Sequence, residues 1–419
     1  MRPNVQRQPL LETRIRRTAL TVQNWSVDYH SALLRLAASL MVIAALVWLA
    51  YQFWRLLWGS EPIWHSSLSG AIDLKLRHEE VHRWFAGLPV YNQLSDAILP
   101  PATYVMLWPL LGWLAVTPAR WLWAVTTVAA LAWLVNLVVK ESHADTTWER
   151  TVVMLMPLSM YATGAAIGNG QLIVHILPVL MAGLLALQQH GPRWRIDLLA
   201  SVFILLALVK PSISAPFFWI VLFRANSWRP ALLVTSGYLA LTLFAVSFQE
   251  PGLVTLLRDW LASSSAIAVT AGQGNVANFH VWLGIIGLEE WILPTSLILL
   301  IVLGCWIYCY RHVDLWLTLG ITAYFARLWT YHRWYDDLLI LLPMIALFRI
   351  AKQQPITWAN RIAIMLLVIT MIAMLAPGGL FLLPPPWNMR YVTGQIIVWT
   401  IGVIFLAVRA SHERKALVN

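Results

Sequence analysis

The residue whose type and position most directly suggest chemistry is an aspartate. Asp73 lies about fifteen residues beyond the first long apolar stretch, in Ser-Gly-Ala-Ile-Asp-Leu-Lys, within a loop too long to be a simple connector. A carboxylate placed just past a membrane span suggests a reaction at a membrane surface. The alternative is that Asp73 only caps the helix-like run that follows it, since aspartate is a good N-cap.

Other polar residues fall on the same predicted side of the membrane as Asp73. Ionisable groups at the ends of spans are costly and are often functional. Each also has a plainer interpretation: Lys210 as an interfacial lysine, Gly-Asn-Gly-Gln as a tight turn, and His332, Asp336 and Asp337 as a surface charge cluster. The candidate residues are Asp73, Tyr91, Asn169, Gln171, Lys210, Asn278, His280, His332 and Arg333.

Motifs of several other function classes are absent from the sequence. There is no Walker A sequence, which argues against a nucleotide-driven pump. No His-Glu-x-x-His or Cys-x-x-Cys metal pattern and no Gly-x-Ser-x-Gly elbow occur. The predicted cytoplasmic loops are too short to hold a separate nucleotide-sugar domain.

Composition identifies an integral membrane protein. Of the 419 residues, 59% are hydrophobic and 11% are charged, whereas about 25% of the residues in a soluble domain are charged. Spans in lipid must be helices or closed barrels, and these segments have the length of helices. The net charge of +10 would suggest nucleic acid in a soluble protein; here it is interpreted as the positive-inside signal.

The elements that must position the candidate residues are transmembrane helices. We predict an all-α protein of about 12 spans, with the apolar run 102–116 lying in the outer surface rather than crossing. Nineteen of the 29 Lys and Arg residues then fall on the side of the N-terminus, which is therefore cytoplasmic. The predicted spans are 36–58, 119–139, 151–167, 171–189, 196–209, 212–223, 231–248, 291–310, 315–331, 335–350, 362–382 and 395–409.

The chain is predicted to form one membrane domain, 36–409, between cytoplasmic tails at 1–35 and 410–419. Two outer loops are long, at about 59–118 and 249–290, and the acidic pairs at 79–80 and 289–290 are expected on solvated faces. The first apolar stretch follows a basic tail and lacks a small-residue cleavage site, so we interpret it as a retained helix and not a signal peptide.

The first outer loop resembles that of the GT-C superfamily of membrane glycosyltransferases. The resemblance is carried by Asp73, then Gly-Leu-Pro-Val-Tyr at 87–91, then Pro-Pro at 100–101. This similarity implies a GT-C fold with juxtamembrane helices in the long first outer loop.

Later segments are similar, more narrowly, to glycosyltransferase family 87, which includes polyprenol-phosphate-mannose-dependent mannosyltransferases. They are Gly-Asn-Gly-Gln at 168–171, Leu-Val-Lys-Pro at 208–211, Asn278 before an apolar helix, and the segment 332–337. The match covers roughly residues 36–350. It departs from the family pattern at His280, where a serine is usual, and in the doubled Asp at 336–337.

The resemblance implies transfer of a hexose, first of all mannose, from a polyprenyl-phosphate donor to a lipid or glycan acceptor on the outer face of the cell (inner) membrane. Asp73 would be the base that takes the acceptor proton in an inverting single displacement. Lys210, His332 and Arg333 would bind the donor phosphate. The residues that would hold sugar or acceptor hydroxyls are Tyr91, Asn169, Gln171, Asn278 and His280.

No cofactor and no nucleic-acid partner are expected. The adjacent carboxylates of Asp336 and Asp337 could still bind a divalent cation, so this alternative stays open. The main rival is a polytopic transporter or lipid-linked sugar flippase, whose polar residues would lie near mid-membrane on broken helices. A non-enzymatic membrane scaffold is the second rival. Within the superfamily, arabinose or glucose in place of mannose also stays open.

Overall fold

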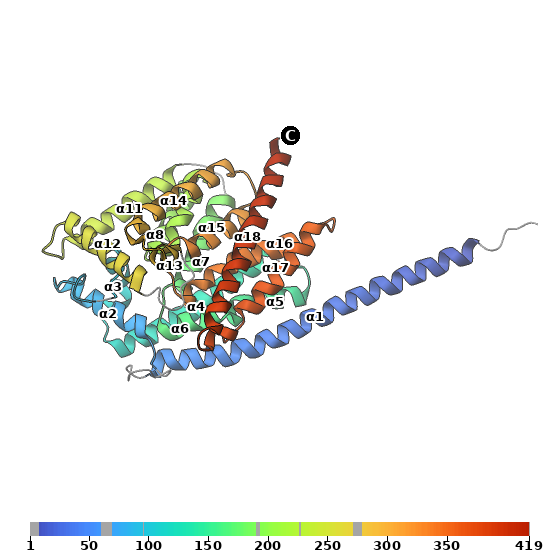
Figure 1. Ribbon diagram of the computed structural model, residues 1–419, viewed down its shortest axis with the longest axis horizontal. Coiled ribbons are helices and arrows are strands. Elements are labelled where there is room, and N and C mark those ends of the chain that lie inside the picture. The colour runs from blue at the N-terminus through green and yellow to red at the C-terminus, as the bar shows by residue number, and fades with distance from the viewer. Residues whose placement is uncertain are drawn as a thin grey trace, which may run out of the picture.

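The computed structural model describes residues 8–59, 69–94, 96–189, 193–225, 228–270 and 279–418, and every regular element within these ranges is helical. The first half of the chain contains α1 (Gln8–Trp58), α2 (Ile72–Phe85), α3 (Pro101–Leu111), α4 (Val116–Glu141), α5 (Thr147–Ser159), α6 (Tyr161–Asn169), α7 (Ile173–Gln189), α8 (Trp194–Ala207), α9 (Pro211–Ser214), η1 (Ala215–Phe217) and α10 (Phe218–Arg224). The second half contains α11 (Arg229–Val246), α12 (Leu253–Thr270), α13 (Phe279–Ile285), η2 (Glu289–Trp291), α14 (Ile292–Cys309), α15 (Leu315–Leu328), η3 (Trp334–Ile340), α16 (Leu341–Ala351), α17 (Trp358–Met374), η4 (Gly379–Leu382) and α18 (Trp387–Val418). The helices form one bundle, from which the N-terminal half of α1 projects (Figure 1).

Within the described residues, five stretches of helix are long and apolar enough to cross a membrane: Ala32–Trp58, Val116–Glu141, Arg229–Val246, Glu289–Cys309 and Trp387–Leu417. The prediction of an all-helical protein with membrane-spanning helices is confirmed at this level. A sixth candidate, α6 with α7, is bent by 116°. The other predicted spans correspond to shorter or broken helices, so length alone does not establish the predicted number of twelve.

One end of the bundle, the far end, is tied together by ion pairs. Lys352 at the end of α16 donates to Glu149 in the first turn of α5, with Nζ 2.5 Å from Oε2. Arg349 lies 3.4 Å from the carboxylate of Asp314, which precedes α15. The backbone N–H of Asp314 in turn donates to Glu413 of α18 at 2.7 Å. These contacts bring the ends of α5, α15, α16 and α18 to one side of the molecule.

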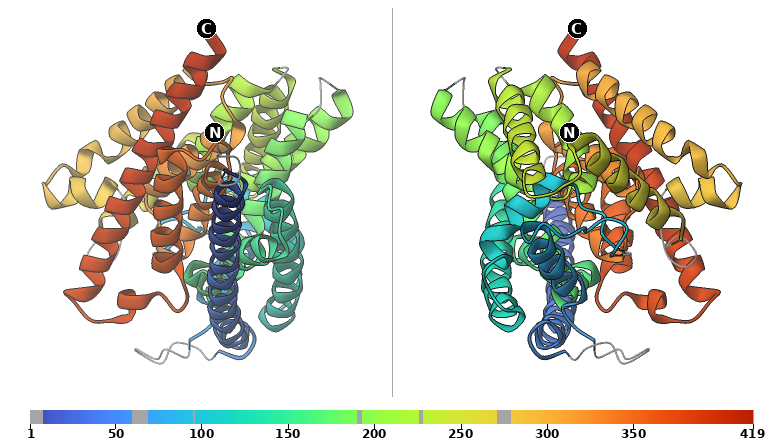
Figure 2. Two further views of the ribbon diagram at one scale, coloured as in Figure 1. Left: turned by 90° about the vertical axis from the view of Figure 1, so that its right-hand side faces the viewer. Right: turned by 90° about the vertical axis from the view of Figure 1, so that its left-hand side faces the viewer.

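The opposite end, the cavity end, carries the short helices α2 and α3. Arg120 in the first turn of α4 donates to the carbonyl of Leu56, near the end of α1, at 2.5 Å. The Trp84 indole of α2 donates to the carbonyl of Ala245 in α11 at 2.9 Å. Most of the segment 102–116, predicted to lie in the outer surface, belongs to the 11-residue helix α3, which packs against α2 and α11. In the right-hand view of Figure 2, α2 and α3 (blue and cyan) lie in front of the bundle, below the C-terminal end of α18.

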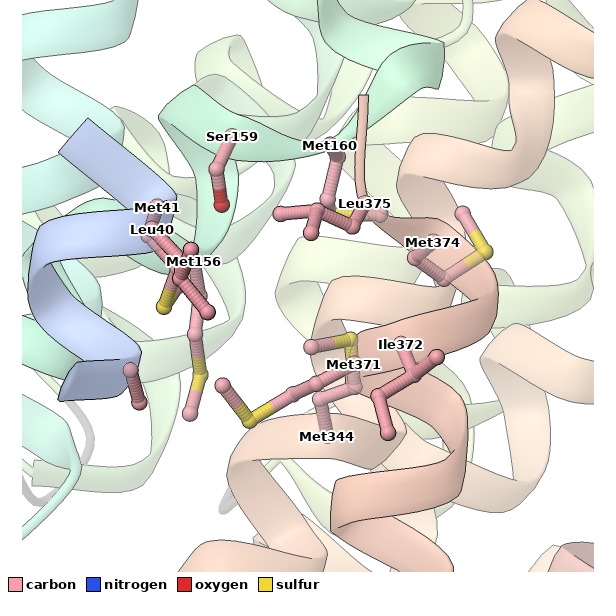
Figure 3. Close-up of a pocket in the computed structure, with 11 residues that line it drawn as sticks. Leu40, Met41, Met156, Ser159, Met160, Met344, Met371, Ile372, Met374 and Leu375 are labelled. Atoms are coloured by element: carbon pink, nitrogen blue, oxygen red, sulfur yellow. The ribbon is translucent and has the colours of Figure 1, made fainter. Parts of the chain in front are cut away.

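An apolar pocket of about 110 Å³ lies between α1, α5, α16 and α17. Six of the twelve methionines line it, and Figure 3 shows Met41 and Met156 on one side and Met344, Met371 and Met374 on the other. Methionine is flexible and fills irregular gaps between helices. The lining of this pocket contains no charged side chain, so we interpret the pocket as a packing feature.

Candidate functional site

The break between α6 and α7 holds the start of α2. The backbone N–H of Ala71 donates to the carbonyl of Gly168 at 2.8 Å. Gly170 ends α6 with a φ of +73°, a conformation that glycine adopts without steric cost. The Gly-Asn-Gly-Gln segment is therefore a helix end on which α2 docks, and the docking places Gln171 beside Asp73.

The turn between α8 and α9 positions Lys210. Thr103 of α3 donates its hydroxyl to the carbonyl of Val209 at 2.7 Å, which fixes the turn from the side of α3. Lys210 is buried, and its Nζ lies 3.0 Å from both carboxylate oxygens of Asp336. Lys210 is thus a partner in a buried ion pair, and the interpretation as an interfacial lysine with its head in water is wrong.

The 3₁₀ helix η3 directs two consecutive aspartates to different partners. The Nδ1 of His332 donates to Oδ2 of Asp336 at 2.9 Å. Asp337 instead accepts hydrogen bonds from Arg327 of α15 and from the hydroxyl of Tyr161 in α6. Successive residues of a 3₁₀ helix are about 120° apart, because it has three residues per turn. Both carboxylates are buried, so this is not a surface charge cluster.

A cavity of about 430 Å³ opens between these elements. Trp260 of α12 closes part of it by donating its indole N–H to the carbonyl of Ile98 at 2.9 Å. The apolar part of the lining includes Leu293 and Leu297 of α14, which are 44% and 51% exposed. This apolar wall therefore continues to the outside of the bundle. The polar and charged residues of the lining are Asp73, Arg77, Asp96, Gln171, Lys210, Ser212, Ser264, Ser265, His280, Ser296, Thr330, Tyr331, Arg333, Tyr335 and Asp336.

Among the described residues, two carboxylates of the cavity lining have no salt bridge, the partly buried Asp73 and the exposed Asp96. Burial raises the pKa of the Asp73 carboxyl. Four groups oppose the increase in pKa: the charge of Arg77, a hydrogen bond from the side chain of Gln171, and the charges of Arg333 and Lys210. The raised pKa gives the Asp73 carboxylate a higher affinity for a proton, and the surrounding cations keep it ionised until it accepts one.

Arg77, one turn after Asp73, connects this residue to a second acid. Its Nη1 donates to both carboxylate oxygens of Glu80, at 2.5 and 2.6 Å, and its Nη2 donates to the carbonyl of Asp96 at 3.2 Å. The Glu80 side chain is 0% exposed. The prediction that Glu80 lies on a solvated face is wrong, because the docking of α2 turns this face of the helix inward. Glu79, on the other face, is exposed as predicted and bonds Arg83.

Two histidines, His280 in the cavity lining and His332 behind it, are held in the neutral state by burial. Burial, with a smaller contribution from the neighbouring His332, lowers the pKa of His280 to about 4. Burial also lowers the pKa of His332, although Asp336 opposes this change. His280 shares a hydrogen bond with the hydroxyl of Ser296 at 2.6 Å. At neutral pH neither imidazole adds a positive charge, and His332 acts on Asp336 from behind the cavity lining.

The structure does not bring every predicted site residue to the cavity. Tyr91 is buried behind the lining and donates its hydroxyl to the carbonyl of Leu99 at 2.6 Å. Asn169 ends α6 outside the lining and accepts a hydrogen bond from Arg55 at 3.3 Å. Asn278 lies outside the described residues. The prediction that Tyr91 and Asn169 contact a sugar therefore lacks geometric support in this arrangement.

No family model, curated protein or solved structure matches this chain. The chemistry of the cavity is therefore argued from its own residues.

Several residues of the site went unnoticed as individual candidates in the sequence. Arg77 and Glu80 lie four and seven residues after Asp73, the spacing that places side chains on one helical face. That periodicity was a signal that they belong together. The pairing of Lys210 with Asp336 spans 126 residues and carries no local signal.

Within the described ranges, no group of three or more His, Cys, Asp or Glu side chains is arranged to hold a metal ion. The cavity instead presents three carboxylates (Asp73, Asp96 and Asp336), three cationic side chains and an apolar wall. Such a site is suited to a ligand that has polar hydroxyls, an anionic group and an apolar chain.

Proposed function

We propose that this protein is a membrane glycosyltransferase of the GT-C type that moves a hexose, with mannose as the first candidate, from a polyprenyl-phosphate donor to a lipid or glycan acceptor. One observation carries the proposal. Asp73, Lys210 and Arg333 line a single cavity, and its apolar wall continues to the outside of the bundle. Polar groups then face the sugar and phosphate, while the polyprenyl chain extends along α14 into lipid.

The proposed reaction is a single displacement at the anomeric carbon. The acceptor oxygen forms the new bond to this carbon while the bond from the carbon to the phosphate oxygen breaks. Asp73 takes the acceptor proton, and polyprenyl phosphate leaves with the bonding electron pair. The carbon is attacked from the side opposite to the leaving group, so a β-linked donor yields an α-linked product.

Arg333 is the residue best placed to meet the phosphate charge. Its side chain lines the cavity and is exposed, and its only described hydrogen bond is to the hydroxyl of Tyr331. Lys210 already neutralises Asp336 through two of its three N–H donors. We therefore assign the larger share of phosphate recognition to Arg333 and the smaller share to Lys210. Gln171 and His280 line the cavity at positions from which they can meet hydroxyl groups.

The path of the chain supports twelve spans with both termini on the cytoplasmic side. In the proposed topology the twelve crossings between the far end and the cavity end are α1, α4, α5–α6, α7, α8, α9–α10, α11, α14, α15, η3–α16, α17 and α18, in the order in which the chain contains them. The helices α2, α3, α12 and α13 do not cross the bundle in this path. The predicted positive-inside orientation then puts the cavity on the outer, periplasmic face of the inner membrane.

A transporter or flippase is the second candidate, and the 116° bend between α6 and α7 is the observation that favours it. The polar residues argue the other way, because they gather where helices end. Gln171 follows the end of α6, Lys210 follows α8, and Arg333 precedes η3. A site at helix ends is suited to a surface reaction, whereas a transporter carries its site near the midplane.

The deciding experiment is a transfer assay with purified protein in lipid vesicles. Radiolabelled polyprenyl-phosphate-mannose is supplied with a pool of lipid and glycan acceptors, and Asp73→Asn is compared with the wild type. We expect label transfer in the wild type and its loss in Asp73→Asn. Glu79→Gln, an equivalent change on the exposed face of the same helix, is the matched control and keeps its activity.

Each other outcome has a definite meaning. Full transfer by a folded Asp73→Asn protein removes Asp73 as the base. Transfer from another polyprenyl-phosphate sugar, but not from mannose, keeps the reaction and changes the substrate. Failure to bind or consume any lipid-linked sugar rejects the glycosyltransferase proposal and favours the transporter as the function.

A further inference from the structure

Asp73, Arg77 and Glu80 form a row along one face of α2. They are separated by four and three residues, so their side chains follow one another on the helix surface. Arg77 is 9% exposed and Glu80 is 0% exposed. The row therefore leads from the cavity, where Asp73 lies, into the interior between α2 and α3.

The guanidinium of Arg77 acts on two carboxylates at once. It binds Glu80 with two hydrogen bonds of 2.5 and 2.6 Å and exerts its charge on Asp73 from the same helix face. One positive charge cannot fully balance two negative charges. When Glu80 is ionised, less of the charge of Arg77 remains to stabilise the carboxylate of Asp73.

Building on the proposed function, we propose that Glu80 is a positioning residue that controls, through Arg77, how strongly Asp73 binds the proton of the acceptor. Glu80 itself does not touch the cavity. In its ionised state it orients Arg77 and takes up most of the guanidinium charge, which makes Asp73 a stronger base. In its neutral state it releases Arg77 to stabilise the Asp73 carboxylate, which makes Asp73 a weaker base.

The surroundings of Glu80 make this switch operate near neutral pH. Burial, together with the charges of Asp73 and Asp96 and opposed by Arg77, raises the pKa of the Glu80 carboxyl to about 7. The hydroxyls of Tyr91 and Tyr104, from the following loop and from α3, also lie close enough to sense its charge. Gln171, Lys210 and Arg333 face Asp73 from the other elements. Two coupled carboxyls of this kind titrate as a pair.

The first test measures carboxyl protonation by infrared spectroscopy and does not depend on any activity. The wild type in lipid should show a carboxyl that titrates near pH 7, and Glu80→Gln should lack it. Asp73→Asn should keep this carboxyl but titrate it at a pH lower by about one unit, because a neighbouring negative charge has been removed. Glu79→Gln should match the wild type throughout.

The second test is the pH dependence of transfer. In the wild type the rate should rise through a step near pH 7, and Glu80→Gln should lose this step. Its rate should then be about threefold to tenfold lower than wild type above pH 8 and similar to wild type below pH 6, as expected for a base weakened by about one pKa unit. Glu80→Asp, which restores a carboxylate, should recover part of the step. Melting temperatures in detergent identify any variant that fails to fold.

The outcomes separate this inference from the proposed function. The inference is overturned if Glu80→Gln still shows the carboxyl that titrates near pH 7. It is also overturned if this carboxyl titrates at the same pH in Asp73→Asn as in the wild type. A folded Glu80→Gln protein whose rate falls equally at every pH also overturns it, since that is the signature of a merely structural residue. If the infrared result holds and no variant transfers any sugar, the coupling stands and the glycosyltransferase proposal fails.

Discussion

Asp336 and Asp337 are neighbours in the chain, yet their side chains bind different partners on different faces of η3. Asp336 accepts hydrogen bonds from Lys210 and His332 at the cavity, and Asp337 accepts hydrogen bonds from Arg327 and Tyr161 inside the bundle. The first aspartate thus organises the cavity, while the second anchors η3 to α6 and α15. The pair gives η3 a fixed orientation.

Asp337→Asn should destabilise the protein, because it removes the negative charge beside the buried guanidinium of Arg327. Removal of one partner of a buried ion pair costs about 3 kcal/mol. The melting temperature in detergent, followed by tryptophan fluorescence, measures the effect. Replacement of both charged partners, Arg327→Leu with Asp337→Leu, should cost less than Asp337→Asn alone; an equal or larger loss would contradict this assignment.

Arg333→Gln should weaken use of the lipid-linked donor without loss of stability. Arg333 is exposed at the cavity, and a charge-assisted hydrogen bond to phosphate is worth about 1.5–3 kcal/mol, or roughly tenfold to a hundredfold in donor affinity. Lys210→Met should lower both donor use and the melting temperature, since Asp336 then loses its cation. The KM for the donor and the thermal melt of each variant test this contrast. An unchanged KM in Arg333→Gln removes this residue from the phosphate site.

Gly170→Ala should disrupt the site by displacing α2. Gly170 has a φ of +73°, and an added Cβ would lie 2.5 Å from the Cβ of Leu74. The backbone strain costs on the order of 1–3 kcal/mol, and the contact moves Asp73 away from Gln171. Gly252→Ala is the control, since no atom lies within 4 Å of its added Cβ. Wild-type melting temperature and transfer rate in Gly170→Ala would disprove the tight docking.

Acid should destabilise the protein partly through His280. Burial lowers the pKa of His280 to about 4 in the folded protein, whereas an unfolded histidine has a pKa of about 6.5. Protons therefore bind preferentially to the unfolded chain, so stability falls as pH drops below about 6.5 and the loss from this residue is complete near pH 4, at roughly 3 kcal/mol. His280→Gln should show a shallower decline in denaturant midpoint between pH 6.5 and 4.5. An identical decline in both proteins rejects this role.

The helical membrane character of this protein follows from its composition alone. Apolar segments in lipid must satisfy their own backbone hydrogen bonds, so their length and hydropathy predict helices without knowledge of the fold. The side of the membrane on which Asp73, Gln171, Lys210 and Arg333 fall was predicted from the alternation of spans and basic loops. These four residues do line one cavity. Local pattern was sufficient because each of them follows or precedes an apolar segment.

The partners of these residues were decided by tertiary structure. Lys210 neutralises Asp336, Glu80 is buried against Arg77, and Tyr91 is turned away from the cavity. Hydropathy reports how apolar a segment is, but it does not report which face of α2 another element will cover. Contacts between residues far apart in the chain depend on how helices dock. Sequence alone therefore predicted the membership of the site better than its electrostatics, which depend on burial and on distances of a few ångströms.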